Sequence, residues 1–239
     1  MNLEVQNIGA DIGRGYVKGF TEVDGLEYSC MFKSVVAIGR NMDFTNYNDP
    51  IFIDIKLNDK IYNNTFCGIL AEEEGHAPVR NSMDSKTTDT VKKLMGALLN
   101  KLALKPTVNI MLGVPNRDFT KTNLRNVIEE YKGKTFEIYD HITDNTKKIK
   151  INDISIFRES DAALLYQVSK EKLNNGNDNV MVNVGFRTTE ISYYDNNLKY
   201  NDKKSKSLEL GNKTVLEYVN SIHPKKSLEE IDSSSRYDD

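Results

Sequence analysis

Residues 11–18 read Asp-Ile-Gly-Arg-Gly-Tyr-Val-Lys and connect two strand patterns, residues 5–10 and 16–20. Glycines in such a turn let backbone N–H groups approach an anion closely, because no Cβ intervenes. Asp11, at the end of the incoming strand, can hold the water shell of a Mg²⁺ ion, and Lys18 can pair with a phosphate. The segment therefore predicts a phosphate-binding turn. A plain hairpin turn is the alternative, since Asp and Gly are common in both.

Residues 182–190, Val-Asn-Val-Gly-Phe-Arg-Thr-Thr-Glu, repeat this arrangement later in the chain. An apolar strand ends at the polar Asn183, Gly185 opens a turn, and a new strand follows. The hydroxyls of Thr188 and Thr189 can donate to phosphate oxygens beside the backbone N–H groups. Two such segments, one in each half of the chain, favour a polyphosphate held between them more strongly than either segment does alone.

A third informative segment lies at residues 157–163, Phe-Arg-Glu-Ser-Asp-Ala-Ala, where a strand pattern passes into a helix pattern. Glu159 would there orient or deprotonate an attacking water in a cleft between two lobes. The alternative is that Ser160 or Asp161 simply caps the helix and that Glu159 is exposed. Both interpretations stay open on the local sequence.

Hydrophobic periodicity places these segments in a mixed α/β protein. Apolar residues spaced three and four positions apart predict a helix over residues 91–102, with N-caps offered by Ser85, Thr87 or Thr88 and an end before Pro106. A polar turn is expected at residues 174–178, and the boundary between the two lobes near residues 157–178. The other predicted elements are strands at residues 26–32, 51–57, 61–67, 108–114, 136–139, 149–157, 180–184 and 190–194, and helices at residues 121–131, 161–172 and 211–222.

The composition is that of an ordinary globular protein and excludes several classes. The chain has 239 residues, a formal net charge of −3, 38% hydrophobic residues and 28% charged residues. No apolar run approaches the ~18 residues of a membrane span, and the N-terminus lacks a secretory signal. Cys30 and Cys67 are too few for a disulfide scaffold, and the balanced charge argues against a dedicated nucleic-acid binder. We therefore expect a cytoplasmic protein without membrane or direct nucleic-acid contact.

Five segments, in this order and spacing, make the chain similar to the actin-like ATPases, specifically the bacterial ParM-type plasmid-segregation actins. This family lies in the superfamily of actin, the sugar kinases and the heat-shock chaperones. The segments are residues 11–18 (first phosphate loop), 113–115 (Gly-Val-Pro, a strand end that crosses into a helix), 158–163 (the segment of the catalytic carboxylate), 183–190 (second phosphate loop) and 210–212 (Leu-Gly-Asn, the helix entry that follows).

The resemblance implies an actin-like, ribonuclease H-like fold with two lobes, in which mixed sheets are flanked by helices. Residues 1–160 would form the first lobe, with an insertion around residues 33–85. Residues 161–224 would form part of a second, incomplete lobe, and residues 225–239 a polar tail. On this interpretation the chain is either a fragment or a natural short form.

The resemblance also implies ATP and Mg²⁺ as cofactors, and it assigns roles to individual residues. Asp11 would lie near the Mg²⁺ ion and take part in catalysis, and Glu159 would be the general base or the group that orients the water. The implied phosphate-binding residues are Gly13, Arg14, Gly15 and Lys18 in the first loop and Asn183, Gly185, Thr188 and Thr189 in the second.

Three departures from the family pattern bear on catalysis. Asn183 stands where the second phosphate loop normally has an Asp, so it supplies no negative charge toward Mg²⁺. Phe186 replaces a residue that is usually small, which predicts crowding at the phosphates. The Gly-rich loop that holds adenine and ribose in the family has no counterpart after Gly211 and Asn212. These departures predict weakened metal binding or hydrolysis and reduced adenine selectivity.

The leading functional hypothesis is an ATP-driven filament protein of the ParM type that acts in plasmid or DNA segregation. It would self-associate and reach DNA through a DNA-binding adaptor protein, consistent with its near-neutral charge. A small-molecule kinase of the same superfold is one alternative, although no substrate-specific loop with an Asp base is visible. A non-catalytic actin-like interaction module is the other, and Asn183 and the absent adenosine loop favour it. ATP hydrolysis is the expected activity, weakened by these two departures.

Overall fold

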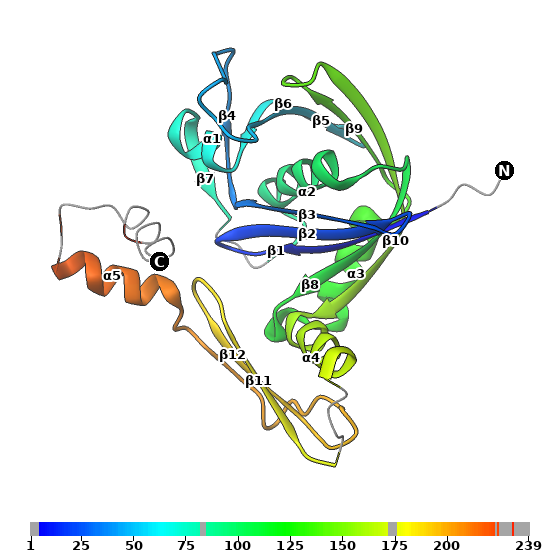
Figure 1. The fold of residues 1–239 in the computed structure, drawn as a ribbon, viewed down its shortest axis with the longest axis vertical. Coiled ribbons are helices and arrows are strands. Elements are labelled where there is room, and N and C mark those ends of the chain that lie inside the picture. Colours follow the sequence, from blue (N-terminus) through cyan, green and yellow to red (C-terminus); the bar gives the residue numbers. More distant parts are fainter. Residues whose placement is uncertain (1–4, 82–84, 172–175, 223, 225–230, 232–239) are drawn as a thin grey trace. The chain divides into compact units, whose positions relative to one another are not determined.

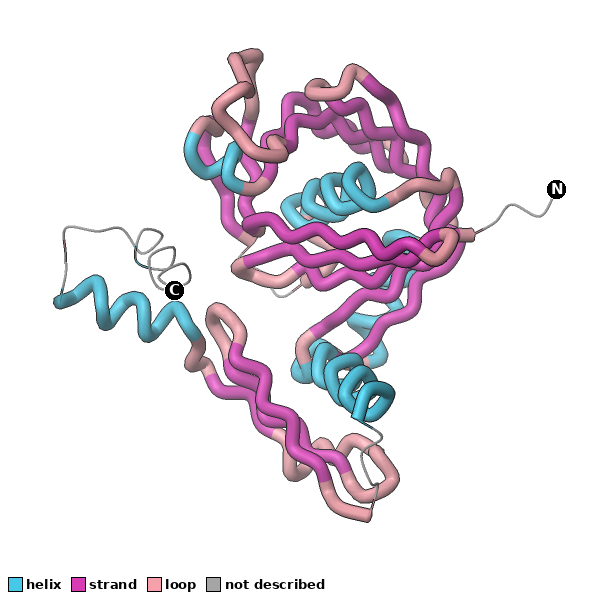
Figure 2. Tube along the Cα trace, in the orientation of Figure 1, coloured by secondary structure: helices cyan, strands magenta, loops and turns pink. Residues whose placement is uncertain are grey.

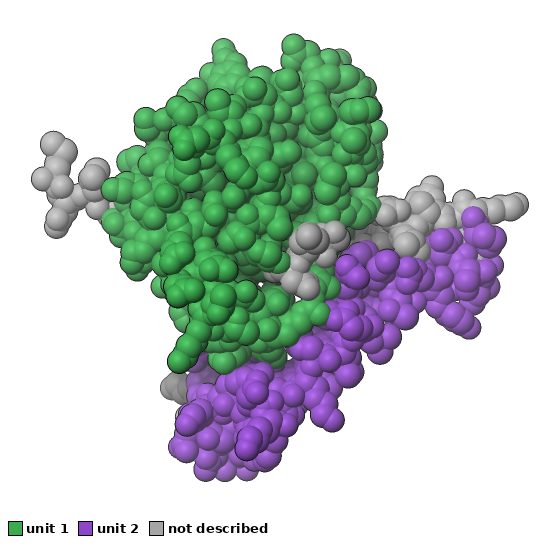
Figure 3. Space-filling model, turned by 180° about the vertical axis from the view of Figure 1, so that it is seen from behind, with its two compact units in different colours: residues 1–159 green, residues 160–239 purple. Residues whose placement is uncertain are grey.

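The computed structural model describes residues 5–81, 85–171, 176–222, 224 and 231. Two compact units make up the chain, residues 1–159 and residues 160–239 (Figure 3). The expected polar tail at residues 225–239 lies, apart from Ile231, outside the described residues, and so does part of the expected turn at residues 174–178.

The first unit is built on one mixed sheet of 10 strands in the order β3-β2-β1-β8-β10-β9-β5-β6-β4-β7 (Figure 1). The sheet curves around helix α2 (Asp89–Leu102), which the strands enclose (Figure 2). The strands are β1 (Gln6–Ile12), β2 (Tyr16–Val23), β3 (Leu26–Lys33), β4 (Val35–Ile38), β5 (Ile51–Leu57), β6 (Lys60–Cys67), β7 (His76–Arg80), β8 (Thr107–Val114), β9 (Thr135–Asp140) and β10 (Asn145–Arg158).

Helix α2 confirms the helix that the periodicity predicts, and it forms the centre of the core. The Thr88 side chain caps it by accepting a hydrogen bond from the Val91 N–H at 3.3 Å. Leu94, Leu98 and Leu99 are fully buried against the inner face of the sheet. Because a helix in this position is covered almost all round, ten of its residues are buried rather than a single stripe.

Three strands of the first unit run parallel and bring their carboxyl ends to one edge of the sheet. Strand β8 lies between β1 and β10, with Ala10 beside Leu112 and Phe157 beside Gly113. Beyond this edge follow a short 3-10 helix, η1 (Asn116–Asp118), and helix α3 (Lys121–Tyr131), which Thr120 caps. Loops that leave the carboxyl ends of neighbouring parallel strands meet in space, so the edge is the place where sequence-distant residues converge.

Several short elements of the first unit were not predicted from the sequence. Strands β4 and β7 and helix α1 (Ile69–Glu73) are four or five residues long and carry no resolvable period. Strand β10 begins at Asn145, earlier than expected, because its polar first half pairs with β9. Strand pairing is made by the backbone, so a polar segment joins a sheet whenever a neighbouring strand supplies the partner.

The second unit is a sheet of three antiparallel strands in the order β11-β12-β13, accompanied by two helices. One face of the hairpin is buried and includes Glu190, Ser192 and Tyr194. The Tyr194 hydroxyl is 2.9 Å from Ser160 Oγ and 2.7 Å from Asp161 Oδ1, which ties the hairpin to the first turn of α4. The elements are α4 (Glu159–Glu171), β11 (Asn179–Val184), β12 (Thr189–Tyr194), β13 (Lys206–Leu208) and α5 (Asn212–Ile222).

The predicted mixed α/β class is confirmed by these two units. Among the helices of the described residues, none has both the length and the apolar character needed to cross a membrane.

Candidate functional site

The first loop (residues 12–16) joins β1 to β2 and begins directly after Asp11. Asp11 lies opposite Lys18 in the ladder, with its Oδ2 3.9 Å from the Lys18 Nζ. The other carboxylate oxygen, Oδ1, is buried and has no hydrogen-bond partner among the described residues. A buried carboxylate oxygen without a partner is the kind of group that a cation or its bound water satisfies.

Gly13 closes the first loop. Its N–H donates to the Tyr16 carbonyl at 3.0 Å, and a Cβ at this position would lie 2.9 Å from that same oxygen. Real Cβ atoms do not approach a backbone oxygen so closely, so the turn requires glycine at residue 13. The sequence-predicted residues Arg14 and Gly15 lie at the tip of this turn.

Three buried polar side chains hold the carbonyls of the first loop, and none of them was singled out from the sequence. The Gly13 carbonyl accepts from Ser34 Oγ at 2.8 Å and from Asn81 Nδ2 at 3.0 Å. The Ile12 carbonyl accepts from Lys86 Nζ at 2.7 Å. Residues 34, 81 and 86 form no motif in the sequence. They are related only because all three donate to carbonyls of the first loop in the folded chain.

Glu159 follows the last residue of β10, at the same sheet edge as the first loop. A Cβ on Gly113 would lie 3.3 Å from Glu159 Cγ and 3.7 Å from the Ala10 carbonyl oxygen. Gly113 therefore separates Glu159 from Ala10 of β1, the residue that precedes Asp11. Both predicted carboxylates thus lie at one edge of the sheet, two strands apart, and Glu159 is half-buried.

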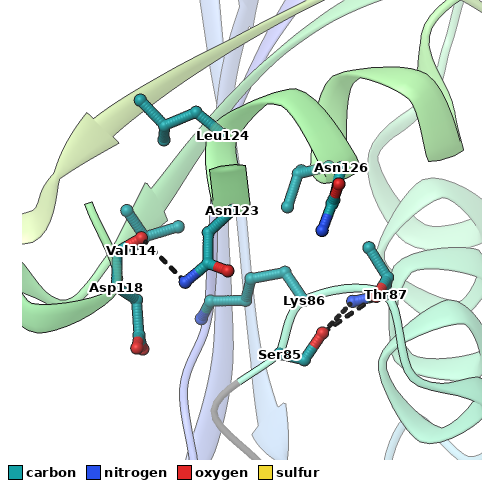
Figure 4. A pocket seen from close by; sticks show the side chains of 9 residues that line it. Ser85, Lys86, Thr87, Val114, Asp118, Asn123, Leu124 and Asn126 are labelled. Atoms are coloured by element: carbon teal, nitrogen blue, oxygen red, sulfur yellow. Dashed lines mark hydrogen bonds between the residues drawn. The ribbon is translucent and has the colours of Figure 1, made fainter. Parts of the chain in front are cut away.

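A small pocket of about 30 Å³ is lined in part by Lys86, whose Nζ donates to the Ile12 carbonyl of the first loop (Figure 4). Burial raises the pKa of the Asp118 carboxyl, although the neighbouring cations Arg117, Lys86 and Arg14 oppose the shift. Asp118 Oδ2 is buried without a hydrogen-bond partner among the described residues. The pocket has room for a water molecule but not for a nucleotide base. Its lining is Ser85, Lys86, Thr87, Val114, Asp118, Asn123, Leu124, Asn126 and Val127.

The second loop (residues 185–188) joins β11 to β12 and repeats the backbone geometry of the first. The Gly185 N–H donates to the Thr188 carbonyl at 2.8 Å, three residues ahead, as Gly13 does to Tyr16. Asn183 pairs with Glu190 seven residues later, the same separation as between Asp11 and Lys18. Position by position, Asn183 and Gly185 therefore correspond to Asp11 and Gly13.

The carbonyls of the second loop are also held, here by the first turn of α5. The Asn212 N–H donates to the Gly185 carbonyl at 3.1 Å, and the Lys213 N–H to the Phe186 carbonyl at 2.8 Å. A Cβ on Gly211 would lie 2.5 Å from the Gly185 carbonyl oxygen, so glycine alone permits this approach. Leu210, Gly211 and Asn212, predicted as the helix entry, thus contact the loop directly.

Thr189 donates its hydroxyl hydrogen to the Leu210 carbonyl at 2.7 Å, so this contact occupies the donor that was expected to serve a phosphate. Thr188, which was also expected to serve a phosphate, accepts the Gly185 N–H with its carbonyl and so closes the loop. The nucleotide roles of the residues in both loops and of Glu159 stay predictions. Among the described residues, no group of three or more His, Cys, Asp or Glu side chains is arranged to hold a metal ion.

Comparison with protein families gives a match over most of the chain. The model of the actin-like proteins' N-terminal domain matches residues 9–160, which include the first loop and Glu159. A search of curated proteins gives no significant match.

Solved structures give the same result for the fold. An archaeal actin homologue in complex with ADP is similar with a TM-score of 0.75 and 18% identity, over 93% of this chain and 66% of that chain. A non-polymerisable quadruple mutant of pCBH ParM gives 0.74 and 20% identity, over 94% of this chain and 69% of its own. AlfA from a B. subtilis plasmid, solved as a filament, gives 0.64 and 14% identity, over 93% and 80%. The chain therefore spans about two thirds of the length of the first two structures.

Proposed function

The chain belongs to the actin-like proteins, through their N-terminal domain, and we propose that it binds ATP with Mg²⁺, hydrolyses it and assembles into filaments. The observation that carries this proposal is the equivalence of the two loops. Gly13 and Gly185 donate to the carbonyl three residues ahead at 3.0 and 2.8 Å, and both hairpins have the same register. Glycine turns of this kind can present backbone N–H groups to an anion such as a phosphate.

Asp11 and its surroundings fit a divalent cation. The Asp11 carboxylate lies at the end of a strand, and its Oδ1 is buried without a protein partner among the described residues. Mg²⁺ prefers carboxylate and phosphate oxygens and keeps several of its waters, so one carboxylate beside a phosphate loop is a sufficient protein contribution. When bound, the ion would neutralise phosphate charge.

Glu159 is the residue that we assign to hydrolysis. It lies at the sheet edge that also carries Asp11, separated from β1 by Gly113, whose lack of a side chain leaves space beside Glu159 Cγ. A carboxylate in that position can accept a hydrogen bond from a water molecule and so orient the water's lone pair toward a phosphorus atom. It can also accept the proton of that water. Catalysis of this kind depends on positioning, and the end of a central strand is a rigid support.

Filament formation and a role in plasmid or DNA segregation are the further parts of this proposal. AlfA, which shares the fold, was solved as a filament. A net charge of −3 gives no basic excess for direct DNA binding, so we propose that DNA is reached through an adaptor protein in the cytoplasm. Self-association would be controlled by the nucleotide.

Calorimetry with Mg²⁺ and AMPPNP, followed by light scattering with Mg²⁺-ATP, tests the proposal. The wild-type chain is expected to bind the analogue and to scatter more light after ATP addition. Gly13→Ala, whose Cβ would lie 2.9 Å from the Tyr16 carbonyl oxygen, is expected to lose binding. Gly9→Ala, on the preceding strand β1, is the matched control, because its Cβ would make only an ordinary contact at 3.7 Å. Wild-type protein that binds no nucleotide overturns the proposal.

A non-catalytic actin-like interaction module is the second candidate, and Asn183 is the observation that favours it. Asn183 occupies the position that corresponds to Asp11 but contributes no negative charge toward a cation. Weak or absent binding of Mg²⁺-AMPPNP to the folded protein would select this candidate over the ATPase, whereas tight binding would count against it.

A further inference from the structure

We propose that Ser34, Asn81 and Lys86 form a carbonyl clamp that orients the peptide groups of the first loop and thereby sets its affinity for a polyphosphate. The inference rests on the proposed nucleotide binding and assigns positioning residues to it. All three are almost completely buried, with exposed fractions of 1%, 4% and 7%. Buried polar side chains are costly unless they are hydrogen-bonded, and each of these three donates a hydrogen bond to a carbonyl of the loop.

The clamp acts through the geometry of the peptide group. In a trans peptide the C=O and the following N–H point in opposite directions, and the described residues contain no cis peptide. Ser34 and Asn81 fix the Gly13 carbonyl on their side of the loop, so the Arg14 N–H must point to the other side. Lys86 holds the Ile12 carbonyl in the same manner, which aims the Gly13 N–H at the Tyr16 carbonyl.

The clamp residues are themselves held by the surrounding fold. The Ser34 N–H donates to the Gly15 carbonyl at 2.9 Å, and the Asn81 N–H donates to the Ser34 carbonyl at 2.8 Å. The buried Tyr131 hydroxyl donates to the Lys86 carbonyl at 2.7 Å. Side chains fixed in this way lose little further entropy when the loop engages a ligand, which is the physical basis of preorganisation.

The second loop supplies an independent instance of the same arrangement. The carbonyl of Gly185, which corresponds to Gly13, accepts from the Asn212 N–H at 3.1 Å. In one hairpin the carbonyl is held by side chains and in the other by a helix terminus, yet the same peptide group is oriented. Two different solutions to one geometric requirement indicate that the orientation itself matters.

The test removes one donor at a time and restores it with a conservative substitution. Ser34→Ala and Lys86→Met are each expected to weaken Mg²⁺-AMPPNP binding roughly 3- to 10-fold, the effect of one lost buried hydrogen bond. Ser34→Thr and Lys86→Arg keep a donor and are expected to stay within about twofold of wild type. Thr65→Val is the matched control, because Thr65, on strand β6, is as buried as Ser34 and its hydroxyl contacts the Tyr62 carbonyl instead of the loop.

Amide hydrogen exchange of the ligand-free protein supplies a readout that a general loss of stability would not imitate. Exchange at Gly13 is expected to accelerate several-fold in Lys86→Met, which releases the Ile12 carbonyl of the same peptide group, and to stay unchanged in Thr65→Val. If the wild-type protein binds Mg²⁺-AMPPNP and Ser34→Ala binds it with the same affinity, the clamp is overturned. Wild-type protein that binds no nucleotide would overturn the proposed function instead. In that case unchanged exchange at Gly13 in Lys86→Met overturns the clamp, and faster exchange supports its orienting role.

Discussion

Asn183 lies directly opposite Glu190 in the β11–β12 hairpin, at the position where Asp11 lies opposite Lys18 in the β1–β2 hairpin. The first hairpin pairs opposite charges, whereas the second pairs a neutral amide with a carboxylate that is only 3% exposed. Directly opposite residues project from the same face with Cβ atoms about 5 Å apart. The second hairpin therefore has a carboxyl group at this position of the ladder, but on its second strand.

This pairing predicts the result of Asn183→Asp. The substitution places two carboxylates opposite each other, and we expect it to destabilise the cation-free protein by about 1 kcal/mol at neutral pH. Since repulsion needs both groups ionised, the loss should grow as pH rises and vanish in acid, as denaturant unfolding at several pH values would reveal. Asn179→Asp, on the same strand but opposite Tyr194, is the control. An equal loss in both variants would contradict this explanation.

Asn183→Asp also tests whether the missing charge limits hydrolysis. If it does, the Mg²⁺-dependent rate of phosphate release from ATP should rise above that of wild type, because the added carboxylate strengthens the cation site. No gain in rate, in a variant that still binds Mg²⁺-AMPPNP, would show that the lost charge is not what weakens the activity.

Gly211→Ala should detach the second loop from helix α5. The new Cβ would lie 2.5 Å from the Gly185 carbonyl oxygen and 2.7 Å from that of Phe186, and neither backbone atom can move aside cheaply. We expect a loss of about 1–3 kcal/mol in unfolding free energy and faster exchange of the Asn212 and Lys213 amides. Gly176→Ala is the control, since nothing lies within 4 Å of its Cβ position. Native exchange rates in Gly211→Ala would disprove the close approach.

Glu159→Gln separates binding from hydrolysis. Amide for carboxylate keeps the shape but removes the base, so we expect the turnover rate of ATP to fall at least about 100-fold while the Kd for Mg²⁺-AMPPNP changes little. Glu129→Gln, an exposed substitution on α3, should leave both quantities unchanged. A turnover rate within a few-fold of wild type would leave Glu159 with a structural role only.

The two thiols should be unreactive in the folded protein. Burial raises the pKa of the Cys67 thiol to about 12 and that of Cys30 to about 11. Only the thiolate reacts, so at pH 7.5 a disulfide reagent should modify both at least about 100 times more slowly than a free cysteine, and Cys67 last. The rate should rise about tenfold per pH unit, and unfolding in guanidinium should release both at once. Rapid modification of native protein would contradict these pKa shifts.

The same pKa shifts have a consequence for stability. A thiol whose pKa is raised by folding binds a proton that the unfolded chain has already lost at high pH. The thiols therefore contribute stability that is complete below the ordinary thiol pKa of about 8.5 and decreases as pH rises above it.

Local patterns were sufficient wherever an element depends on its own side chains. Helix α2 and the β1–β2 hairpin follow from leucine spacing and from the position of Gly13, because helix periodicity and tight turns are local constraints. The sequence does not predict the short strands β4 and β7 or the polar start of β10, because their backbones are paired by neighbouring strands and not by any pattern in their own side chains. Burial of Glu190 was likewise invisible, as strand alternation alone does not say which face is covered.

The amino-acid order alone contains the two glycine turns, their equal spacing and the carboxylates at the strand ends, and these features, together with residues 113–115 and 210–212, make the chain resemble the actin-like proteins. Folding adds contacts between residues that are distant in the sequence. Parallel pairing of β1, β8 and β10 brings Asp11 and Glu159 to one edge, and residues 34, 81 and 86 converge on the carbonyls of the first loop. A glycine's backbone freedom is a property of one residue, whereas the direction of a carbonyl depends on donors that only the three-dimensional packing supplies.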